Sequence, residues 1–546
     1  MESQRNKRIA RGMAGRLALV MALLLVFALA LAGCGNGGSG GGTGTGTGGG
    51  DTRELVIGIA GSPASIDVNQ EAGILNYYIA AIAQEGLVSI SNDGEVIPAL
   101  AESWTDDDAT VWTFKLRKGA KFQDGTDVTA DDIVFSIEQA QDPVKSPGTS
   151  IYFPKYVQSV EQTADDEVRI TLDGPHASFI WSVSNAGGLF VTSRAFAESA
   201  KAIGSPQELI LGSGPYKAVE FEPGSHATFE AVDTWWNGKP AIESVRFDFI
   251  ADENTRLLAF TQGDLDFALN IPVEQSEQWE KVEGATVEYV ADRSYFGLTF
   301  DPGVEPFGDE HVRRAVAYAI DKEGIVSGSI LKGHGTAATA IPAPEQFASV
   351  FSASEAAQKL ANVAHYDYSI EKAKEELALS SVPDGFETTI YYPDSYQNAG
   401  KASLAIAESL KDLGITLNVK EIPLDQWLGE VGDGNQGVAW MIYYPTTAEP
   451  GEITNWLLDA QGAGYNPANW TNKAVSALTA RVMGADSLEA QIDPILESNN
   501  IAQELAIYAP VFWGQAAVAY SSRIQLDGYG SYTLLTTNWP DRFTKS

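Results

Sequence analysis

Three aromatic side chains lie close together in residues 437–450, whose sequence is GVAWMIYYPTTAEP. Trp440, Tyr443 and Tyr444 could form a wall on which apolar side chains, sugar faces or a cation stack, because aromatic rings attract all three. The same rings could instead pack a strand into a hydrophobic core. The segment is therefore a candidate ligand contact with a structural alternative.

Motifs that would carry bond chemistry are missing from the sequence. It contains no phosphate-binding P-loop and no His-Glu-x-x-His pair, and its one Gly-x-Ser-x-Gly match, at 37–41, lies in a Gly-rich stretch and not between a strand and a helix. The five histidines are isolated in polar surroundings, which favours surface or loop positions. The acidic run 106–108 lacks the glycine and distal glutamate of a calcium loop, so it indicates a solvated turn. We expect no enzyme activity, no metal site and no cofactor.

The N-terminus has the order of an export signal. Basic residues precede an unbroken apolar run at 17–32, which is short for the roughly 20 residues of a membrane span. The only cysteine of the chain, Cys34, follows Leu31-Ala32-Gly33, and this resembles a bacterial lipobox, in which the thiol is lipidated. We expect a signal peptide over 1–33, a lipid on Cys34 and a flexible Gly-rich tether over 34–53. An uncleaved anchor with a chance cysteine is the alternative.

Length and composition bound the remaining possibilities. The 546 residues, with 12 Trp, 20 Tyr and 22 Phe, suffice for several domain-sized units with large cores. A single cysteine excludes an internal disulfide framework. The 72 acidic residues against 36 basic ones give a net charge of −36, which would repel phosphate backbones. We expect no nucleic-acid partner.

Helical and strand patterns alternate along the chain. Residues 55–59 and 111–117 read as strands, and residues 129–138 read as a helix capped by Thr129. Asp309 can cap a helix whose apolar stripe includes Val312, Val316 and Ile320, with Arg313 and Arg314 on its surface. A helix with apolar positions at 404, 407 and 410 leads through Gly414 into a strand at 415–420. The mixture indicates an α/β class in more than one lobe.

Several short motifs occur in one order from about residue 54 to the C-terminus: LAESW at 100–104, WTFKLRKG at 112–119, FQDGT at 122–126, GSGPYK at 212–217, WWNGKP at 235–240, GDLD at 263–266, DEHVRRAVAYAID at 309–321 and APVF at 509–512. In this order and spacing the chain resembles the extracytoplasmic solute-binding proteins of ABC importers, family 5, the oligopeptide/dipeptide-binding type. Each motif alone is weak, but the series covers essentially the whole chain after the tether.

The resemblance implies a two-lobed, periplasmic-binding-protein-like fold of type II, similar to cluster C, with an extra domain inserted in the N-terminal lobe. Lobe one would comprise 54–90, 205–295 and 511–546, the extra domain 91–204, and lobe two 296–510. The chain would cross between the lobes twice, which permits hinge closure over a ligand.

The implied function is capture of a small solute, in this family most often a peptide, and its delivery to the permease of an ABC importer. The resemblance also implies a monomer that lies outside the cell and is held at the membrane by the lipid on Cys34. Alternatives are a non-peptide solute (an oligosaccharide, an amine or a metal chelate), a sensory lipoprotein, or an extracellular hydrolase with an unrecognised carboxylate pair.

Family peptide binders often hold the free amine of the ligand with an aspartate in the segment that ends in an Asp-Pro or Glu-Pro step. Counting back from Glu449-Pro450 without gaps places Tyr443 at the family's aromatic position and Thr446 at that of the aspartate. Threonine cannot neutralise a buried ammonium group, and an uncompensated charge there costs several kcal/mol. Either the ligand has no free amine at that point, or another acid, such as Glu449 or one from lobe one, takes the role.

Two further candidates come from the resemblance alone. Residues 61–78 match the family's first cleft-facing loop, in which Glu71 is a candidate partner of an amine or a hydroxyl. Tyr152 lies in a Pro/Gly-flanked loop of the extra domain and is a third candidate aromatic contact. With Trp440, Tyr443, Tyr444 and Thr446, these residues form the predicted ligand site.

Overall fold

The structure is a computed structural model that describes residues 54–545, apart from 72, 425, 428, 430–435 and 459–465. The chain divides into two units, Met1–Asp51 and Thr52–Ser546, and all described residues belong to the second. The predicted signal peptide, Cys34 and the tether therefore lie outside the described residues. Among the helices that the structure describes, none is both long and apolar enough to cross a membrane.

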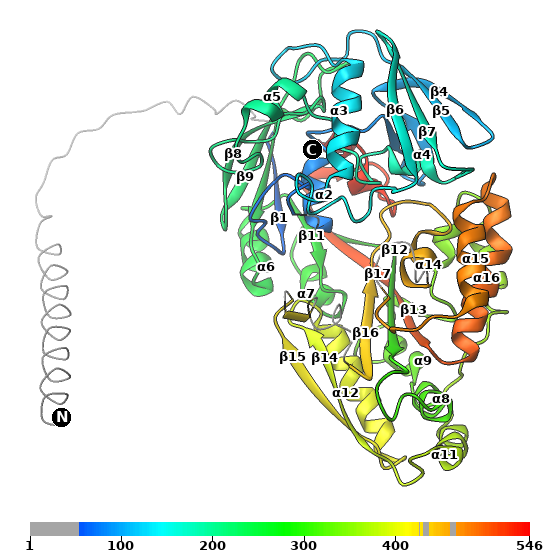
Figure 1. Cartoon of the computed structure of the whole chain (residues 1–546). Helices are drawn as coiled ribbons and strands as arrows, with labels where there is room; N and C mark the ends of the chain where they lie inside the picture. The colour runs from blue at the N-terminus through cyan, green and yellow to red at the C-terminus, as the bar shows by residue number, and fades with distance from the viewer. Residues whose placement is uncertain are drawn as a thin grey trace, which may run out of the picture. The chain divides into compact units, whose positions relative to one another are not determined.

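One large mixed sheet runs through the described part of the chain (Figure 1). Its path follows the order β16, β12, β17, β11, β1, β10, β9 and β8, and β13 pairs with β17 outside this path. The strands are β1 (Glu54–Ile59), β8 (Tyr216–Glu222), β9 (His226–Ala231), β10 (Ser244–Phe249), β11 (Phe267–Ile271), β12 (Ala285–Phe300), β13 (Gly335–Ala337), β16 (Val438–Tyr443) and β17 (Tyr508–Ser521).

Two long strands, β12 and β17, join β16 to β11 and the rest of this sheet. They are antiparallel, from the pair Ala285↔Ser521 to the pair Thr299↔Tyr508. The C-terminal part of β17 also pairs with β11, whereas the C-terminal part of β12 pairs with β16. Both predicted crossing points between the lobes, at 295/296 and 510/511, fall inside these two strands. The exact domain limits stay a prediction.

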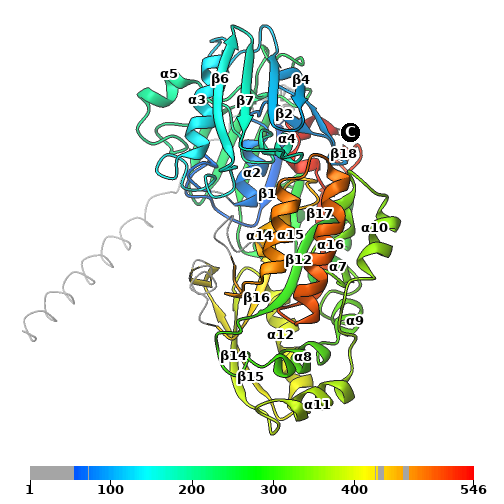
Figure 2. The ribbon, with the colours of Figure 1, turned by 45° about the vertical axis from the view of Figure 1, so that its right-hand side comes forward.

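A second sheet has the order β4, β5, β7 and β6, and helix α3 lies next to it in Figures 1 and 2. The elements are β4 (Ala101–Asp107), β5 (Val111–Leu116), β6 (Val157–Ala164), β7 (Glu167–Leu172) and α3 (Ala130–Gln141). Phe114, Ile133 and Ile170 are fully buried in the core between them. All of these elements fall within the range predicted for the extra domain.

The residues after β12 form helices and a two-stranded parallel sheet of β14 (Glu387–Pro393) and β15 (Thr416–Ile422). The helices of this region are α8 (Glu310–Tyr318), α9 (Lys322–Ser327), α10 (Ala353–Leu360), α11 (Ile370–Leu379), α12 (Gln397–Lys411), α14 (Glu452–Leu458), α15 (Lys473–Met483) and α16 (Leu488–Glu504). Helices α14, α15 and α16 pack on one another beside β12 and β17 (Figure 2).

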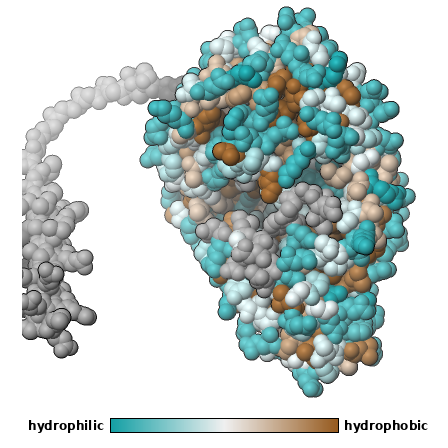
Figure 3. Space-filling view, viewed as in Figure 1, coloured by the Kyte–Doolittle hydropathy of each residue, from teal (hydrophilic) through white to brown (hydrophobic). Residues whose placement is uncertain are grey.

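The remaining described elements are short. They comprise α2 (Ile74–Ala80), α4 (Phe179–Ser182), α5 (Arg194–Ser199), α6 (Glu253–Gln262) and α7 (Ser276–Glu280), with the strand pairs β2 (Val88–Ile90) with β3 (Val96–Pro98) and β18 (Ile524–Leu526) with β19 (Phe543–Lys545). Hydrophilic side chains cover much of the face shown in Figure 3, and apolar ones interrupt it in separate patches.

The predicted local elements are largely confirmed. Strands β1 and β5 match the predicted ranges closely, and Thr129 caps α3 in a capping box with Asp132. Asp309 accepts the hydrogen bond of the His311 backbone N–H and caps α8, whose predicted apolar stripe is buried. Strand β15 begins one residue after its predicted start. The α/β class is thus confirmed.

Three predictions about single side chains were wrong. Leu404 is 62% exposed, because the buried stripe of α12 runs through Ala399, Ala402, Ile406 and Leu410 instead. Arg313 is buried and donates to the carbonyls of Phe307, Gly308 and Leu505, so it does not serve the helix surface. His226 is buried on β9 beside Glu220, so it has neither a surface nor a loop position, whereas His176, although buried, does lie in a loop as predicted.

Candidate ligand-binding site

The carboxylate of Glu452, the first residue of α14, organises the segment predicted to face the ligand. It accepts hydrogen bonds from the backbone N–H groups of Thr446 (3.0 Å) and Thr447 (3.1 Å). The Thr447 hydroxyl donates to it at 2.5 Å, and the Tyr443 hydroxyl donates at 3.3 Å. Burial raises the pKa of Glu452, and these donors oppose that rise. The acid therefore fixes the loop that follows β16 and leaves little capacity for a ligand.

Trp456, one turn further along α14, brings two predicted contacts together. Its ring lies 6.1 Å from the ring of Tyr443, centroid to centroid, with the planes tilted by 38°. The ring of Trp456 also stacks on the ring of Tyr152, with the centroids 5.1 Å apart and an interplanar angle of 25°. Tyr152 is 46% exposed. The loop that carries Tyr152 and the helix that carries Trp456 thus meet next to Tyr443.

Tyr444 belongs to a second group of rings. It lies 6.1 Å from Tyr396, nearly parallel at 21°, and Phe296 meets both rings edge-on at 6.0 and 6.1 Å. Burial raises the pKa of Tyr396 to about 12 and that of Tyr444 well above its ordinary value. Both tyrosines nevertheless keep part of their surface accessible.

Asp292 on β12 faces this second group of rings. The strand bulges there, since Asp292, Arg293 and Ser294 all lie opposite the single residue Gly514 of β17. One carboxylate oxygen of Asp292 accepts from the backbone N–H of Ser294 (2.9 Å) and from its hydroxyl (2.5 Å). Burial raises the pKa of Asp292, which in turn acts electrostatically on Tyr396 and Tyr444.

The neighbouring Arg293 is bound elsewhere. Its guanidinium donates to the carbonyls of Ser531 (2.8 Å) and Pro445 (2.9 Å) and lies 3.8 Å from the centre of the Tyr532 ring. The side chain is buried. It therefore ties β12 to the loop after β16 and to the C-terminal segment, instead of reaching toward a ligand.

The structure gives Trp440 a packing role. Its side chain has no exposed surface, and its indole N–H donates to the Ser403 hydroxyl at 2.7 Å inside the core. Strand alternation explains this, because Trp440 and Tyr443 stand on opposite faces of β16. We keep Trp440 out of the proposed site.

Thr446 and Glu71 lie apart from one another and have local hydrogen bonds. Thr446 lies in the loop after β16, and its backbone N–H donates to the Glu452 carboxylate. Glu71 accepts from the backbone N–H groups of Ala64 (2.8 Å) and Ser65 (3.0 Å), and so closes its own loop. The role of Glu71 as a ligand partner stays a prediction.

Glu449 is the alternative acid named from the sequence. Burial, and next the charge of Glu452, raise the pKa of Glu449 to about 8. A hydrogen bond with Ser178 opposes this rise. Glu449 is therefore largely protonated at neutral pH, and a neutral carboxyl attracts an ammonium group weakly.

Further hydrogen bonds join the predicted extra domain to the last helices near this site. The Ala177 backbone N–H donates to the Ala485 carbonyl at 2.9 Å, and the Gln491 amide donates to the Ser178 hydroxyl at 2.8 Å. The His176 Nδ1 lies 2.6 Å from the Met483 carbonyl oxygen. The rings of Tyr152 and Trp456 thus belong to a larger contact between these two regions.

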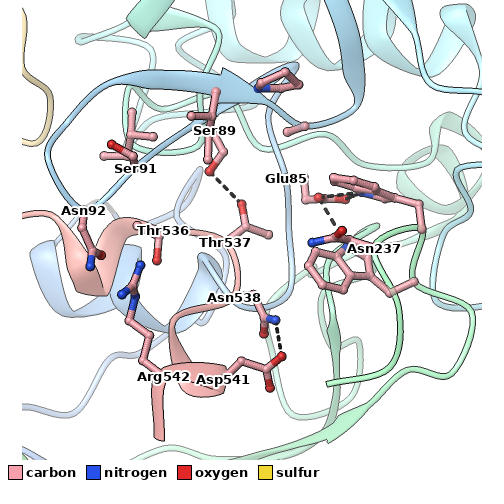
Figure 4. Close-up of a pocket in the computed structure, with 16 residues that line it drawn as sticks. Glu85, Ser89, Ser91, Asn92, Asn237, Thr536, Thr537, Asn538, Asp541 and Arg542 are labelled. Carbon is pink, nitrogen blue, oxygen red and sulfur yellow. Dashed lines mark hydrogen bonds between the residues drawn. The ribbon is translucent and has the colours of Figure 1, made fainter. Parts of the chain in front are cut away.

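A separate pocket of about 390 Å³ lies beside Glu85 (Figure 4). Many of its polar groups bond to one another: Ser89 to Thr537 at 3.0 Å, the Asn538 amide to Asp541 at 2.6 Å, and the Trp236 indole N–H to Glu85 at 3.0 Å. None of the predicted site residues lines it. Within the described ranges, no cluster of His, Cys, Asp or Glu side chains could hold a metal ion.

Sequence reasoning missed Asp292, Tyr396, Glu452 and Trp456. One signal was available, since three consecutive polar residues, Asp292-Arg293-Ser294, interrupt the strand pattern of 285–300. An acid from lobe one is one of the predicted alternatives for binding the ligand amine. Asp292 falls in the range predicted for that lobe. Tyr396 and Trp456 carried no comparable signal, because only the fold brings them to the site.

Comparison with known proteins identifies the family of the chain. Residues 95–465 match the family described as "Bacterial extracellular solute-binding proteins, family 5 Middle". The chain is 27% identical over 447 residues to the glutathione-binding protein GsiB of Escherichia coli, which covers 79% of this chain and 83% of that protein. Heme-binding protein A of Haemophilus influenzae is 26% identical over 464 residues, covering 79% and 81%.

A solved structure has the same fold. The periplasmic binding protein DppA of Helicobacter pylori, in complex with the peptide STSA, superimposes with a TM-score of 0.77. The match is 23% identical and covers 90% of this chain and 98% of that chain. The predicted periplasmic-binding-protein-like fold is thereby confirmed.

Proposed function

The chain belongs to the bacterial extracellular solute-binding proteins of family 5, and from this premise we propose that it captures a small solute outside the cell and delivers it to the permease of an ABC importer. The observation that carries the proposal is the meeting of Tyr152 and Trp456 beside Tyr443. These rings come from regions far apart in the sequence, so a solute held among them would join the two regions.

The capture step would work by hinge closure. Strands β12 and β17 join β16 to β11 and the rest of the large sheet, and a bulge interrupts their pairing between Ala291 and Tyr295. A solute that touches both sides favours the closed form by its difference in affinity for the two forms. The permease would then distinguish the loaded receptor from the empty one by its shape.

A peptide or a similarly extended solute is the proposed ligand class. The names of the relatives cover several chemistries, namely glutathione for GsiB, heme for heme-binding protein A and the peptide STSA for DppA. Aromatic walls suit such ligands, because rings accept varied side chains without demanding one hydrogen-bond pattern. We propose that the protein acts as a receptor that releases its solute unchanged, and that it does so as a monomer.

The membrane position is proposed on the sequence alone. Cys34, at the end of the export signal, would carry a lipid, and residues 34–53 would tether the folded part close to the permease. A sensory lipoprotein would have the same parts. Deletion of the gene separates these functions, since an importer receptor is required for solute uptake whereas a sensor is required for a response.

The test is capture without turnover. Purified full-length protein is incubated with a peptide mixture and with a small-molecule extract of bacteria, and the bound fraction is identified by native mass spectrometry. We expect one solute per protein, recovered intact, with a more compact particle in small-angle X-ray scattering. Release of cleaved products would indicate a hydrolase, and an unchanged scattering profile on binding would contradict hinge closure.

A further inference from the structure

The bulge at Asp292–Ser294 sets one acidic side chain apart from the rest of β12. Three residues of β12 occupy the space opposite one residue of β17, and Arg293 adopts a left-handed conformation (φ 63°). A Cβ atom on Gly514 would come within 2.3 Å of the Ser294 hydroxyl and 3.2 Å of an Asp292 carboxylate oxygen. The glycine therefore makes room for the bulge, and bulges often re-aim a side chain beside a functional site.

The acid that the bulge presents forms no salt bridge with a described residue, although the charge of the adjacent Arg293 opposes the rise in its pKa that burial causes. Ser294 occupies one oxygen of the Asp292 carboxylate, through its backbone N–H and its hydroxyl. No ion pair joins Asp292 to any lysine, arginine or histidine in the part of the chain that the structure describes. The terminal nitrogens of the adjacent Arg293 donate to two backbone carbonyls, and its guanidinium stacks on Tyr532.

The charge of this acid reaches tyrosines from four separate segments. Tyr78 comes from α2, Tyr396 precedes α12, Tyr444 follows β16 and Tyr529 lies in the C-terminal segment, and Asp292 acts electrostatically on all four. Each of these tyrosines is half-buried, and so is Asp292, so part of each side chain remains accessible. The faces of aromatic rings carry partial negative charge. Rings and a carboxylate can therefore attract the same cation.

A largely desolvated carboxylate that forms no direct ion pair is costly unless a further positive group pairs with it. A ligand can supply that group. We propose that Asp292 and the rings of Tyr396 and Tyr444 form a subsite for a positively charged nitrogen of the solute, an inference that rests on the proposed function. The subsite replaces the acid that the sequence lacks at Thr446, and it lies on one of the two strands that join β16 to the rest of the sheet.

Glu449 is the competing acid, and the structure favours Asp292 over it. Glu449 bonds with Ser178 and lies beside a second carboxyl, that of Glu452, so it is neutral over much of the physiological range. Asp292 has no neighbouring carboxyl among the groups that act on it. The variants Asp292→Asn and Glu449→Gln distinguish the two acids. Only the variant of the acid that binds the solute should lose capture.

The test uses purified full-length protein and three probes: a mixture of tripeptides without Lys, Arg or His, the same mixture after N-acetylation, and a small-molecule extract of bacteria. Bound solutes are quantified by native mass spectrometry. We expect the wild-type protein to retain solutes with a positively charged nitrogen and to prefer the free-amine tripeptides at least tenfold over the acetylated ones. Asp292→Asn, which keeps the oxygen that accepts from Ser294, should lower this capture at least tenfold.

The matched control is Asp166→Asn, which removes the same charge from the surface pair with Lys115. It should retain wild-type capture. Two results with the wild-type protein alone would overturn the subsite: equal retention of free and acetylated tripeptides, or capture of only neutral and anionic solutes. Either result would leave the proposed receptor function intact. Loss of capture in Glu449→Gln, with full capture in Asp292→Asn, would overturn the subsite as well. Capture of nothing from any probe would overturn both proposals.

Discussion

The ring of Tyr152 stacks on the ring of Trp456, with the centroids 5.1 Å apart and the planes 25° from parallel. Tyr152 lies in the range predicted for the extra domain, and Trp456 lies on α14, in the range predicted for lobe two. The first residue of the same helix, Glu452, fixes the loop after Tyr443. One short helix therefore couples the contact between the two regions to the shape of the candidate ligand wall.

Replacing Tyr152 by Ala should weaken solute binding by up to about tenfold, because an aromatic pair contributes roughly 0.5–1.5 kcal/mol. The melting temperature should change little, since the ring is 46% exposed. Titration of the captured solute by isothermal calorimetry measures the affinity. Tyr368→Ala is the control, because Tyr368 is 47% exposed and lies outside the candidate site. An equal loss in both variants would argue against a specific role of the stack.

Tyr443→Ala should lower solute affinity about tenfold or more if the ring stacks on the ligand, an interaction of roughly 1–3 kcal/mol. Tyr443→Phe keeps the ring and removes only the 3.3 Å hydrogen bond to Glu452, so most of the affinity should remain. The same calorimetric titration compares the two variants. Wild-type affinity in Tyr443→Ala would assign the ring to the core.

Trp440→Phe tests the opposite assignment. The change removes the donor to Ser403 inside the core and leaves that hydroxyl with only its own bond to the Ala399 carbonyl. The free energy of unfolding should fall by about 1–3 kcal/mol, while solute affinity should stay within twofold of wild type. Urea unfolding measures the first quantity. A large loss of affinity with unchanged stability would return Trp440 to the ligand site.

Stability should fall as the pH rises from about 4.5 to about 8. The pKa of Glu449 is raised from 4.5 to about 8, so between these values the folded protein holds a proton that the unfolded chain has lost. The folded state then loses up to about 1.4 kcal/mol per pH unit for such a group. Burial also raises the pKa of Asp67 to about 6 and that of Glu85 to about 7, with the same sign.

Glu449→Gln should remove part of this pH dependence and leave the share of Asp67 and Glu85. Urea unfolding at pH 5 and pH 8 provides the comparison, with Asp166→Asn as the control at the exposed pair with Lys115. An identical difference between the two pH values in wild type and Glu449→Gln would show that Glu449 titrates normally.

Cys34→Ser should release the protein from the membrane fraction, because serine has no thiol for the lipid to join. Fractionation of cells followed by detection of the protein in medium, soluble and membrane fractions measures the distribution. Retention in the membrane would favour the uncleaved anchor instead.

The local parts of the fold could be predicted from the sequence because they depend on neighbours along the chain. The capping box of Thr129, the cap at Asp309 and the strand alternation of β5 each involve residues within a few positions. Leu404 marks the limit of this reasoning, since a helix with apolar residues on two faces does not reveal which face meets the core. The neighbouring elements bury Ile406 and leave Leu404 in solvent.

For the site, the sequence determined the segment at 437–450 and the absence of an acid at Thr446. Only the tertiary structure decided which rings share the site, because Tyr152, Tyr396 and Trp456 meet it from separate segments. It also decided that Trp440 and Tyr443 differ in role and that Asp292 leaves the regular strand. The physical reason is that a bulge, a buried charge and a stacked pair depend on partners far away in the chain, such as Gly514 opposite Asp292, and no local pattern records those partners.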